Sequence, residues 1–246
     1  MNANPAPLVN QLPELVHTIE DYGFAIIPDV INAVAIDSVI QDIERLHVTN
    51  AVRRRNNQIF GIRDLVNVTP STKKLAENDL IASVAQALVG KDAKVVRSLC
   101  FEKSAEANWK VIWHQDVTIA VGSRRNVKGY GPWTSKAGIV HAQAPSSVLE
   151  KIIALRIHLD NTDESNGALK VIPGSHRHGR MTRTQIELLT RESKPISCNV
   201  PRGGVLLMRP LLVHSSSAGA RPSHRRVVHL EFTGIGLPGG LEWYGS

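Results

Sequence analysis

Little cysteine, few aromatic residues and no long apolar run set the first limits on this chain. Cys100 and Cys198 are its only cysteines, too few for the disulfide framework of a small secreted domain, so we expect a reducing, cytoplasmic setting. No apolar run reaches the roughly 18 residues that a membrane-spanning helix needs, so we expect no membrane partner. Residues Met1 to Asn10 lack a basic segment followed by an apolar core, which argues against a secretory signal.

Acidic residues are also outnumbered. The chain has 29 Lys and Arg against 22 Asp and Glu, for a formal net charge of +7, with basic clusters at Arg53–Arg55, Arg124–Arg125 and Arg177–Arg183. Such clusters are typical of a solvated basic surface or of a site for an anionic ligand. Aromatic residues make up only 4% of the chain, and proteins that read single strands stack bases on aromatic side chains. No helix-turn-helix, zinc-finger or RNA-binding signature is present, so we expect no nucleic-acid partner.

Length and periodicity predict one mainly β domain with flanking α-helices. The 246 residues, 42% of them hydrophobic, fit a single large β domain over residues 1–246. Helical spacing predicts helices over Leu12–Asp21, Asn32–Leu46, Asn78–Val89 and Gln185–Arg191, so the portion from about 8 to 90 is helical. Between them, Phe24–Ile27 is predicted as a strand and Arg53–Thr72 as irregular. Strands then dominate from about 93 to 235, at Val95–Phe101, Lys110–Asp116, Lys151–Asp160, Ala168–Ile172, Val205–Met208 and Arg225–Phe232.

Two histidines and one aspartate form a candidate metal site. His114 and Asp116 flank Gln115, and His214 follows a second apolar strand far downstream. Because side chains alternate along a strand, His114 and Asp116 would face one metal ion while Gln115 points away from it. Two imidazoles and a carboxylate are the ligands of the facial triad that holds Fe(II) and leaves positions open for a co-substrate and O2. The pattern therefore predicts a non-haem iron centre.

The last predicted strand carries an arginine suited to a carboxylate. Within Arg225–Phe232, alternation places Arg225, His229 and Glu231 on one face and apolar side chains on the other. A guanidinium pairs with a carboxylate through two parallel hydrogen bonds, so Arg225 could anchor the far end of a co-substrate that chelates the metal. Arg226 is its rival, because alternation lets only one of the two point inward. His229 shares the face of Arg225 and is a candidate for a supporting role in the pocket.

Five motifs resemble those of the phytanoyl-CoA dioxygenase family of Fe(II)- and 2-oxoglutarate-dependent oxygenases. They occur in family order, at Tyr22–Pro28, Asn108–Asp116, Asn166–Leu169, Pro173–His176 and Arg209–His214. The resemblance extends from about Leu12 to Phe232. It implies a double-stranded β-helix (jelly-roll, cupin-like) core, Fe(II) as the metal, and 2-oxoglutarate and O2 as co-substrates.

The resemblance also implies a role for each matching position. The iron ligands would be His114, Asp116 and His214, and Arg225 would grip the distal carboxylate of 2-oxoglutarate with help from the Ser216 hydroxyl. Gln115 and Trp133 are further candidates for the co-substrate pocket. The implied activity is hydroxylation of an unactivated C–H bond of a small organic substrate, with release of succinate and CO2. Desaturation and epimerisation by the same iron remain open, whereas Asp116 argues against halogenation, because halogenases of this type leave the carboxylate position empty for halide.

The basic segment ahead of the strand-rich core is a candidate for binding the substrate. Arg63, or one of Arg53 to Arg55 with Arg55 foremost, would bind a carboxylate or other anionic group of a small-molecule substrate. No oligomeric state follows from the sequence.

Two other classes of function fit the same ligands. A redox-neutral, metal-dependent isomerase or epimerase of the cupin type would use another metal, since histidine–carboxylate sets also accept Zn(II) and Mn(II). A binding module that has kept the fold without catalysis is the other. A dependence of turnover on 2-oxoglutarate distinguishes the oxygenase from the isomerase, and loss of metal binding in His114→Ala without biochemical consequence would support the module.

Overall fold

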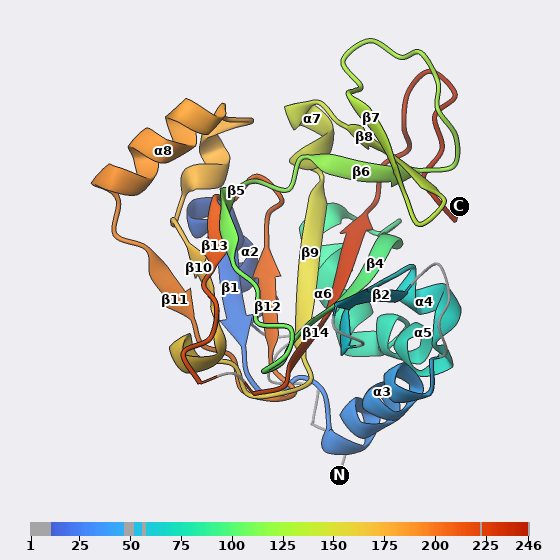
Figure 1. Ribbon diagram of the computed structural model, residues 1–246. Helices are drawn as coiled ribbons and strands as arrows, with labels where there is room; N and C mark the ends of the chain where they lie inside the picture. The colour runs from blue at the N-terminus through green and yellow to red at the C-terminus, as the bar shows by residue number, and fades with distance from the viewer. Residues whose placement is uncertain (1–10, 47–51, 56–57, 222, 246) are drawn as a thin grey trace.

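Two antiparallel sheets face each other in a jelly-roll sandwich, and a third small sheet lies across one end (Figure 1). The computed structural model describes residues 11–46, 52–55, 58–221 and 223–245, and of residues 53–55 and 58–60 the backbone alone. The major sheet has seven strands in the order β1-β12-β9-β14-β4-β3-β2, and the minor sheet has four in the order β11-β10-β13-β5. The third sheet has the order β6-β8-β7. The predicted mainly β jelly-roll fold is confirmed.

The elements of the major sheet come from both halves of the chain. Its strands are β1 (Phe24–Ile27), β2 (Val52–Arg55), β3 (Gln58–Arg63), β4 (Lys94–Lys103), β9 (Ile152–His158), β12 (Val205–Met208) and β14 (Arg225–Thr233). The minor sheet consists of β5 (Val111–His114), β10 (Leu169–Val171), β11 (Ile196–Cys198) and β13 (His214–Ser216). The third sheet consists of β6 (Thr118–Val121), β7 (Trp133–Lys136) and β8 (Ile139–Gln143). Figure 1 shows β6 to β8 across the upper end of β9 and β14.

Helices cover the outer face of the major sheet. The α-helices are α2 (Leu12–Tyr22), α3 (Ala33–Arg45), α4 (Leu65–Val68), α5 (Pro70–Ala76), α6 (Asp79–Val89), α7 (Ser146–Leu149) and α8 (Arg183–Glu192), and two 3-10 turns lie at Glu164–Asn166 and Ser175–His178. The Asn32 and Asn78 side chains accept hydrogen bonds from the first backbone N–H groups of α3 and α6, which explains where these helices begin. The three helices predicted before residue 90 are therefore present. No helix among the described residues is long and apolar enough to cross a membrane.

Strand alternation gives the major sheet one apolar face and one polar face. The outward side chains Val228, Leu230 and Phe232 of β14 belong to the main apolar core, together with residues of α3 and α6. The inward side chains of the same strand include Arg225, His229 and Glu231, all of them buried. The polar face predicted for this strand therefore lines the interior of the sandwich, where the site lies.

Two segments differ from the prediction. Arg53–Thr72 was predicted as irregular, but it contains β2, β3, α4 and α5. The hairpin of β2 and β3 forms because β3 pairs with the edge of β4, a long-range contact that a basic, weakly alternating segment does not reveal. The strands of the third sheet were not predicted either, because they are short and pair with each other and with Trp243 near the end of the chain. A single domain over residues 1–246 stays a prediction.

Candidate metal centre

His114, Asp116 and His214 lie together at one end of the minor sheet. His114 ends β5 and His214 begins β13, and the two residues are direct partners in the register of these strands. One ligand atom from each of the three residues falls within 4.8 Å of the others. Asp116 lies beyond the end of β5, where its N–H donates to the Pro210 carbonyl at 2.8 Å. The structure therefore brings together the three predicted ligands, although Asp116 is not itself in the strand.

Backbone carbonyls orient both imidazoles toward the carboxylate. His114 Nδ1 lies 2.8 Å from the Ile112 carbonyl and His214 Nδ1 lies 2.8 Å from the Leu212 carbonyl, so each Nδ1 carries the proton and donates. Each Nε2 then presents its lone pair, at 3.7 Å from an Asp116 oxygen in both cases. A carbonyl bonded to the far nitrogen of the ring is the usual outer partner of a metal-binding histidine. The donor set fits a divalent metal ion held on one face.

The electrostatics of the three groups favour metal binding. Burial raises the pKa of the Asp116 carboxyl, but the nearby His214, His114, His229 and Arg97 outweigh it and hold that pKa well below its usual range. Burial lowers the pKa of His214 to about 4, with Asp116 opposing the shift. The aspartate is therefore ionised and His214 neutral near pH 7, which is the protonation state that a metal ion requires.

Buried cationic side chains gather between the sheets around Arg225, where they could hold an anion, and we call this cluster the anion pocket. Arg225 and Lys103 are direct partners in the register of β14 and β4, and both side chains are almost fully buried, at 2% and 1% exposure. Lys103 Nζ lies 2.7 Å from Ser216 Oγ, which donates to the Gly167 carbonyl. Arg225 Nη1 donates to the same carbonyl at 3.0 Å. Arg225 and Ser216, both predicted here, thus meet at one carbonyl, and Lys103 joins them.

Arg226 points the other way, as alternation requires. Its guanidinium pairs with Asp160 through two hydrogen bonds of 2.9 and 2.8 Å, and Nη1 also contacts Glu44. Arg225, by contrast, forms no ion pair with any carboxylate of the described residues. Burial and the neighbouring charge of Arg156 lower its pKa to about 9, so it remains charged at neutral pH. Arg225 is therefore the inward arginine of the two.

A chain of hydrogen bonds connects the anion pocket to the strand that follows Asp116. Arg156 Nη1 donates to His229 Nδ1 at 3.1 Å, and His229 Nε2 donates to Glu231 Oε1 at 3.0 Å. Arg97 Nη1 donates to the same Glu231 oxygen at 3.0 Å and to the Thr118 carbonyl at 3.1 Å. The supporting role considered for His229 agrees with this position, since the imidazole holds Arg156 inside the sandwich.

Two buried guanidinium nitrogen atoms near the pocket have no hydrogen-bond partner among the described residues. They are Nε of Arg225 and Nε of Arg156, on the paired strands β14 and β9. Buried polar groups are almost always hydrogen-bonded, so two buried guanidinium donors without acceptors indicate a place for an anionic guest. A dicarboxylate that reaches from the metal to Arg225 would supply the missing acceptors.

Gln115 and Trp133, the two remaining candidates for the co-substrate pocket, lie among loops and on the third sheet, respectively. The Gln115 amide donates to the Gly179 and Leu211 carbonyls and accepts from the Met181 N–H, so it links three loops around the site. Trp133 lies on β7 in the third sheet, with Arg124 5.9 Å from its ring centre. Contact of Gln115 or Trp133 with 2-oxoglutarate stays a prediction.

Of the two candidate substrate residues, the structure describes the side chain of Arg63 but not that of Arg55. Arg63 ends β3 on the inward side, opposite Leu99 of β4, and lines two cavities of about 110 and 300 Å³. The side chain of Arg55 lies outside the described residues, as do those of Arg53 and Arg54. Binding of substrate by Arg63 or Arg55 stays a prediction.

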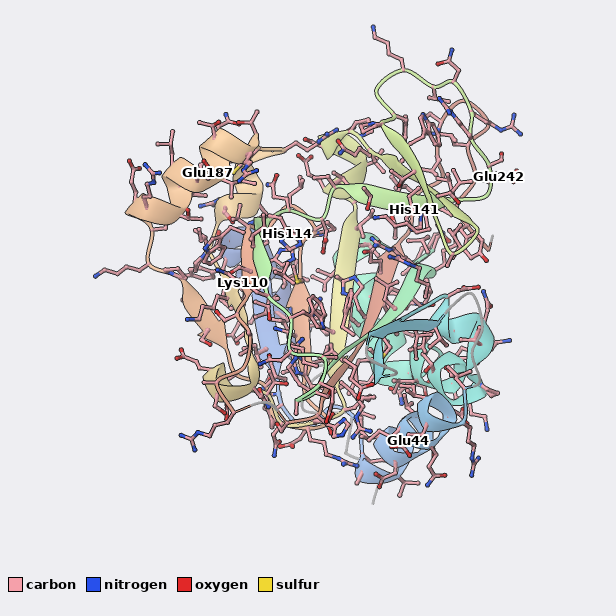
Figure 2. The ribbon with its side chains drawn as sticks, viewed as in Figure 1. Glu44, Lys110, His114, His141, Glu187 and Glu242 are labelled. Carbon is pink, nitrogen blue, oxygen red and sulfur yellow. The ribbon has the colours of Figure 1, made fainter. Side chains whose placement is uncertain are left out.

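The sequence analysis missed Lys103 and Arg156. Both are buried, but they stand in different strands. Arg156 is the only Lys, Arg, Asp or Glu of β9, whereas Lys103 ends β4 directly after Glu102. A charged side chain almost never becomes fully buried without a partner, so the lone charge in an apolar strand was a signal for Arg156, while the polar sequence around Lys103 offered none. Figure 2 shows His114 near the upper end of β5.

The jelly roll and the His-Asp-His cluster together form a candidate non-haem metal centre with the ligand set of the facial-triad type. The family model of phytanoyl-CoA dioxygenase (PhyH) matches residues 19–227, so the chain belongs to this family and the predicted resemblance is confirmed. Fe(II) is accordingly the metal of this site, with 2-oxoglutarate and O2 as co-substrates.

Solved structures agree on the fold. EctD from S. alaskensis, crystallised with 2-oxoglutarate and 5-hydroxyectoine, is 18% identical with a TM-score of 0.71, over 90% of this chain and 76% of that one. AviO1 from Streptomyces viridochromogenes Tue57 is 20% identical with a TM-score of 0.67, over 92% and 95%. The epimerase SnoN from nogalamycin biosynthesis is 17% identical with a TM-score of 0.66, over 94% and 82%. No curated protein sequence matches the chain.

Proposed function

We propose that this protein hydroxylates an unactivated C–H bond of a small, anionic organic substrate, with conversion of 2-oxoglutarate to succinate and CO2. The observation that carries the proposal is the arrangement of His114, Asp116 and His214 in one sandwich with a buried, cationic pocket at Arg225. A metal centre alone would suit many reactions, whereas a metal centre with an internal dicarboxylate pocket suits 2-oxoglutarate chemistry.

In this proposal each residue has a definite task. His114, Asp116 and His214 hold Fe(II) through two Nε2 atoms and a carboxylate oxygen. Arg225 and Lys103 hold the distal carboxylate of 2-oxoglutarate, and the Ser216 hydroxyl is within reach of the same group. The iron supplies the oxidising chemistry once 2-oxoglutarate and O2 are bound.

The polar chain beneath the site keeps the pocket in place. His229 accepts from Arg156 and donates to Glu231, so the guanidinium is held at a fixed angle beside the face of Phe101, 5.4 Å from its ring centre. A pre-arranged cationic pocket avoids the cost of ordering flexible side chains when the co-substrate binds.

Binding of 2-oxoglutarate to the anaerobic Fe(II) protein tests the proposal. We expect a visible metal-to-ligand charge-transfer band in the wild type, and weaker bands in Asp116→Ala and Arg225→Ala. Succinate release in the presence of candidate substrates would then report turnover. Absence of the band from a metal-loaded wild type would contradict the proposal and favour the redox-neutral isomerase.

The outcome at the substrate carbon is a separate question. The similar fold of the epimerase SnoN makes epimerisation the second candidate, and desaturation by the same iron is a further alternative. Mass spectrometry of the product distinguishes them, because hydroxylation adds one oxygen atom, desaturation removes two hydrogen atoms and epimerisation leaves the mass unchanged. We expect the added oxygen atom to come from O2.

A further inference from the structure

A cavity of about 300 Å³ opens on the inner face of the major sheet, between β3 and β4. The inward side chains around it are Arg63, Leu99, Phe101 and Trp109, while Gly61 contributes only backbone. Three of its walls are thus apolar and two of these are aromatic, and one guanidinium is present. Small-molecule sites typically combine such apolar walls with a few polar groups that fix orientation.

The cavity shares its walls with the residues around the metal centre. The Phe101 ring packs edge-on against His229, with the ring centres 5.8 Å apart. The Trp109 ring centre lies 5.2 Å from Lys103 Nζ and 6.4 Å from the centre of Phe101. A molecule in the cavity would therefore contact Phe101 and Trp109, which in turn contact His229 and Lys103.

Gly61 keeps this space open. It is the direct partner of Phe101 in the register of β3 and β4, and its conformation needs no glycine. A Cβ atom built there would lie 3.4 Å from the Cys100 carbonyl and within 4 Å of no other described atom outside its chain neighbours. A larger side chain at this position would fit the backbone and occupy the cavity.

Arg63 stands where this cavity meets a second, more polar one. The second cavity, of about 110 Å³, shares Arg63 and Leu99 with the first and is also lined by Arg97 and His141. Burial and the nearby Arg97 lower the pKa of His141 to about 4, so the imidazole is neutral. The lining of this second cavity also contains Asp64, which accepts from Asn67 Nδ2 at 2.7 Å and from the Tyr244 hydroxyl at 3.2 Å. Arg63 therefore lies where an apolar space meets a polar one.

We infer that the substrate is a compact monocarboxylic acid, which binds as the free acid with its carboxylate at Arg63 and its apolar body against Leu99, Phe101 and Trp109. The inference rests on the proposed function, because it assigns the substrate of that same site. A cavity of about 150 Å³ lined by apolar side chains holds benzene, so 300 Å³ suits an apolar body of about a dozen non-hydrogen atoms. A coenzyme A thioester is far larger and would lack the free carboxylate.

Calorimetric binding of small acids tests this assignment. The probes are 3-phenylpropionate, cinnamate, octanoate and 1-naphthoate, each compared with its primary amide, and 3-phenylpropionyl-coenzyme A. Each titration is made with the metal-free protein and with the anaerobic protein that holds Fe(II) and 2-oxoglutarate. The variants are Gly61→Val and Arg63→Gln, with Gly236→Val and Arg183→Gln as exposed controls.

We expect at least one acid to bind tenfold or more tightly than its amide, because a charge-assisted hydrogen bond is lost in the amide. Arg63→Gln should abolish this difference, and Gly61→Val should abolish binding of acid and amide alike. Both variants should keep the charge-transfer band of 2-oxoglutarate, and both controls should behave as the wild type.

Three results would overturn the inference. They are binding of none of the acids, an acid preference that survives Arg63→Gln, and binding of the thioester as tightly as the acid. Failure of the proposed function gives a different result, since the wild type would then lack the charge-transfer band whatever the acids do.

Discussion

Arg156 donates a hydrogen bond to His229 Nδ1, and this single contact determines where His229 carries its proton. A guanidinium only donates, so Nδ1 accepts and the proton resides on Nε2, which then donates to Glu231 at 3.0 Å. Burial lowers the pKa of His229, which also favours the neutral imidazole ring. Among the described residues, Glu231 is thus the carboxylate at the centre of this series of hydrogen bonds, and it balances two arginines, Arg97 directly and Arg156 through the imidazole.

Removal of the Glu231 charge should destabilise the fold. Glu231→Gln removes the buried carboxylate that pairs with Arg97 directly and with Arg156 through His229, and breaking a buried ion pair by removing one partner costs about 3 kcal/mol or more. We expect a corresponding loss in the free energy of unfolding, measured by urea denaturation. Glu187→Gln is the matched control, because Glu187 pairs with Arg183 on the exposed surface of α8 and should cost less than about 0.5 kcal/mol (Figure 2). Equal losses in the two variants would refute the role given to Glu231.

Arg225 and Arg226 are neighbours with opposite tasks, which allows a sharp comparison. Arg225→Gln removes the buried guanidinium of the anion pocket, and we expect 2-oxoglutarate to bind about 100-fold more weakly, since truncation of a buried charge partner costs about 2–5 kcal/mol. Arg226→Gln removes the outward pair with Asp160 and should leave this affinity within about twofold. Titration of the charge-transfer band measures both. A larger effect of Arg226→Gln would exchange the two assignments.

The lowered pKa of Lys103 should make the binding of 2-oxoglutarate depend on pH. Burial, with the charges of Arg225 and Arg156, lowers its pKa to about 7, so the free protein loses this proton as the pH rises above 7. A bound carboxylate favours the charged form, so binding above pH 7 must take up a proton and the affinity for 2-oxoglutarate should fall from pH 7 to 8.5. The unfolded chain keeps its proton to about pH 10.4, so the stability of the free protein should rise over the same interval.

Two lysine variants separate this effect from general changes with pH. Lys103→Met should bind 2-oxoglutarate more weakly at pH 6.5 and show a flat profile up to pH 8.5. Lys110→Met, at an exposed lysine just before β5, should keep the slope of the wild type. A wild-type affinity that does not change with pH would show that Lys103 is not part of the pocket.

The metal ligands should be distinguishable from other buried histidines. His214→Ala removes one of two Nε2 donors, and we expect loss of Fe(II) binding at micromolar metal, measured by metal content after anaerobic loading and gel filtration. His141→Ala removes a histidine of similar burial that lies outside the cluster, and it should retain one metal ion per chain. Retention of metal by His214→Ala would place the ion elsewhere.

Much of the site could be predicted because it depends on local order in the sequence. The short spacing of His114 and Asp116 guarantees that they stay close in any extended segment, and alternation along β14 alone separates Arg225 from Arg226. The apolar runs and the asparagine caps likewise identify helices and strands, since both signals act within a few residues.

Tertiary structure decided what depends on pairing between distant strands. Lys103 meets Arg225 only because β4 and β14 pair in one register, and a shift of β4 by one residue would turn Lys103 to the opposite face from Arg225. The hairpin of β2 and β3 exists because β4 offers it an edge, which places Gly61 beside Phe101 and opens the cavity there. The sequence by itself therefore determined the candidate metal ligands and the inward arginine. The meeting of Lys103 with Arg225 and the cavity beside Gly61 followed from contacts between strands far apart in the chain, which no local pattern encodes.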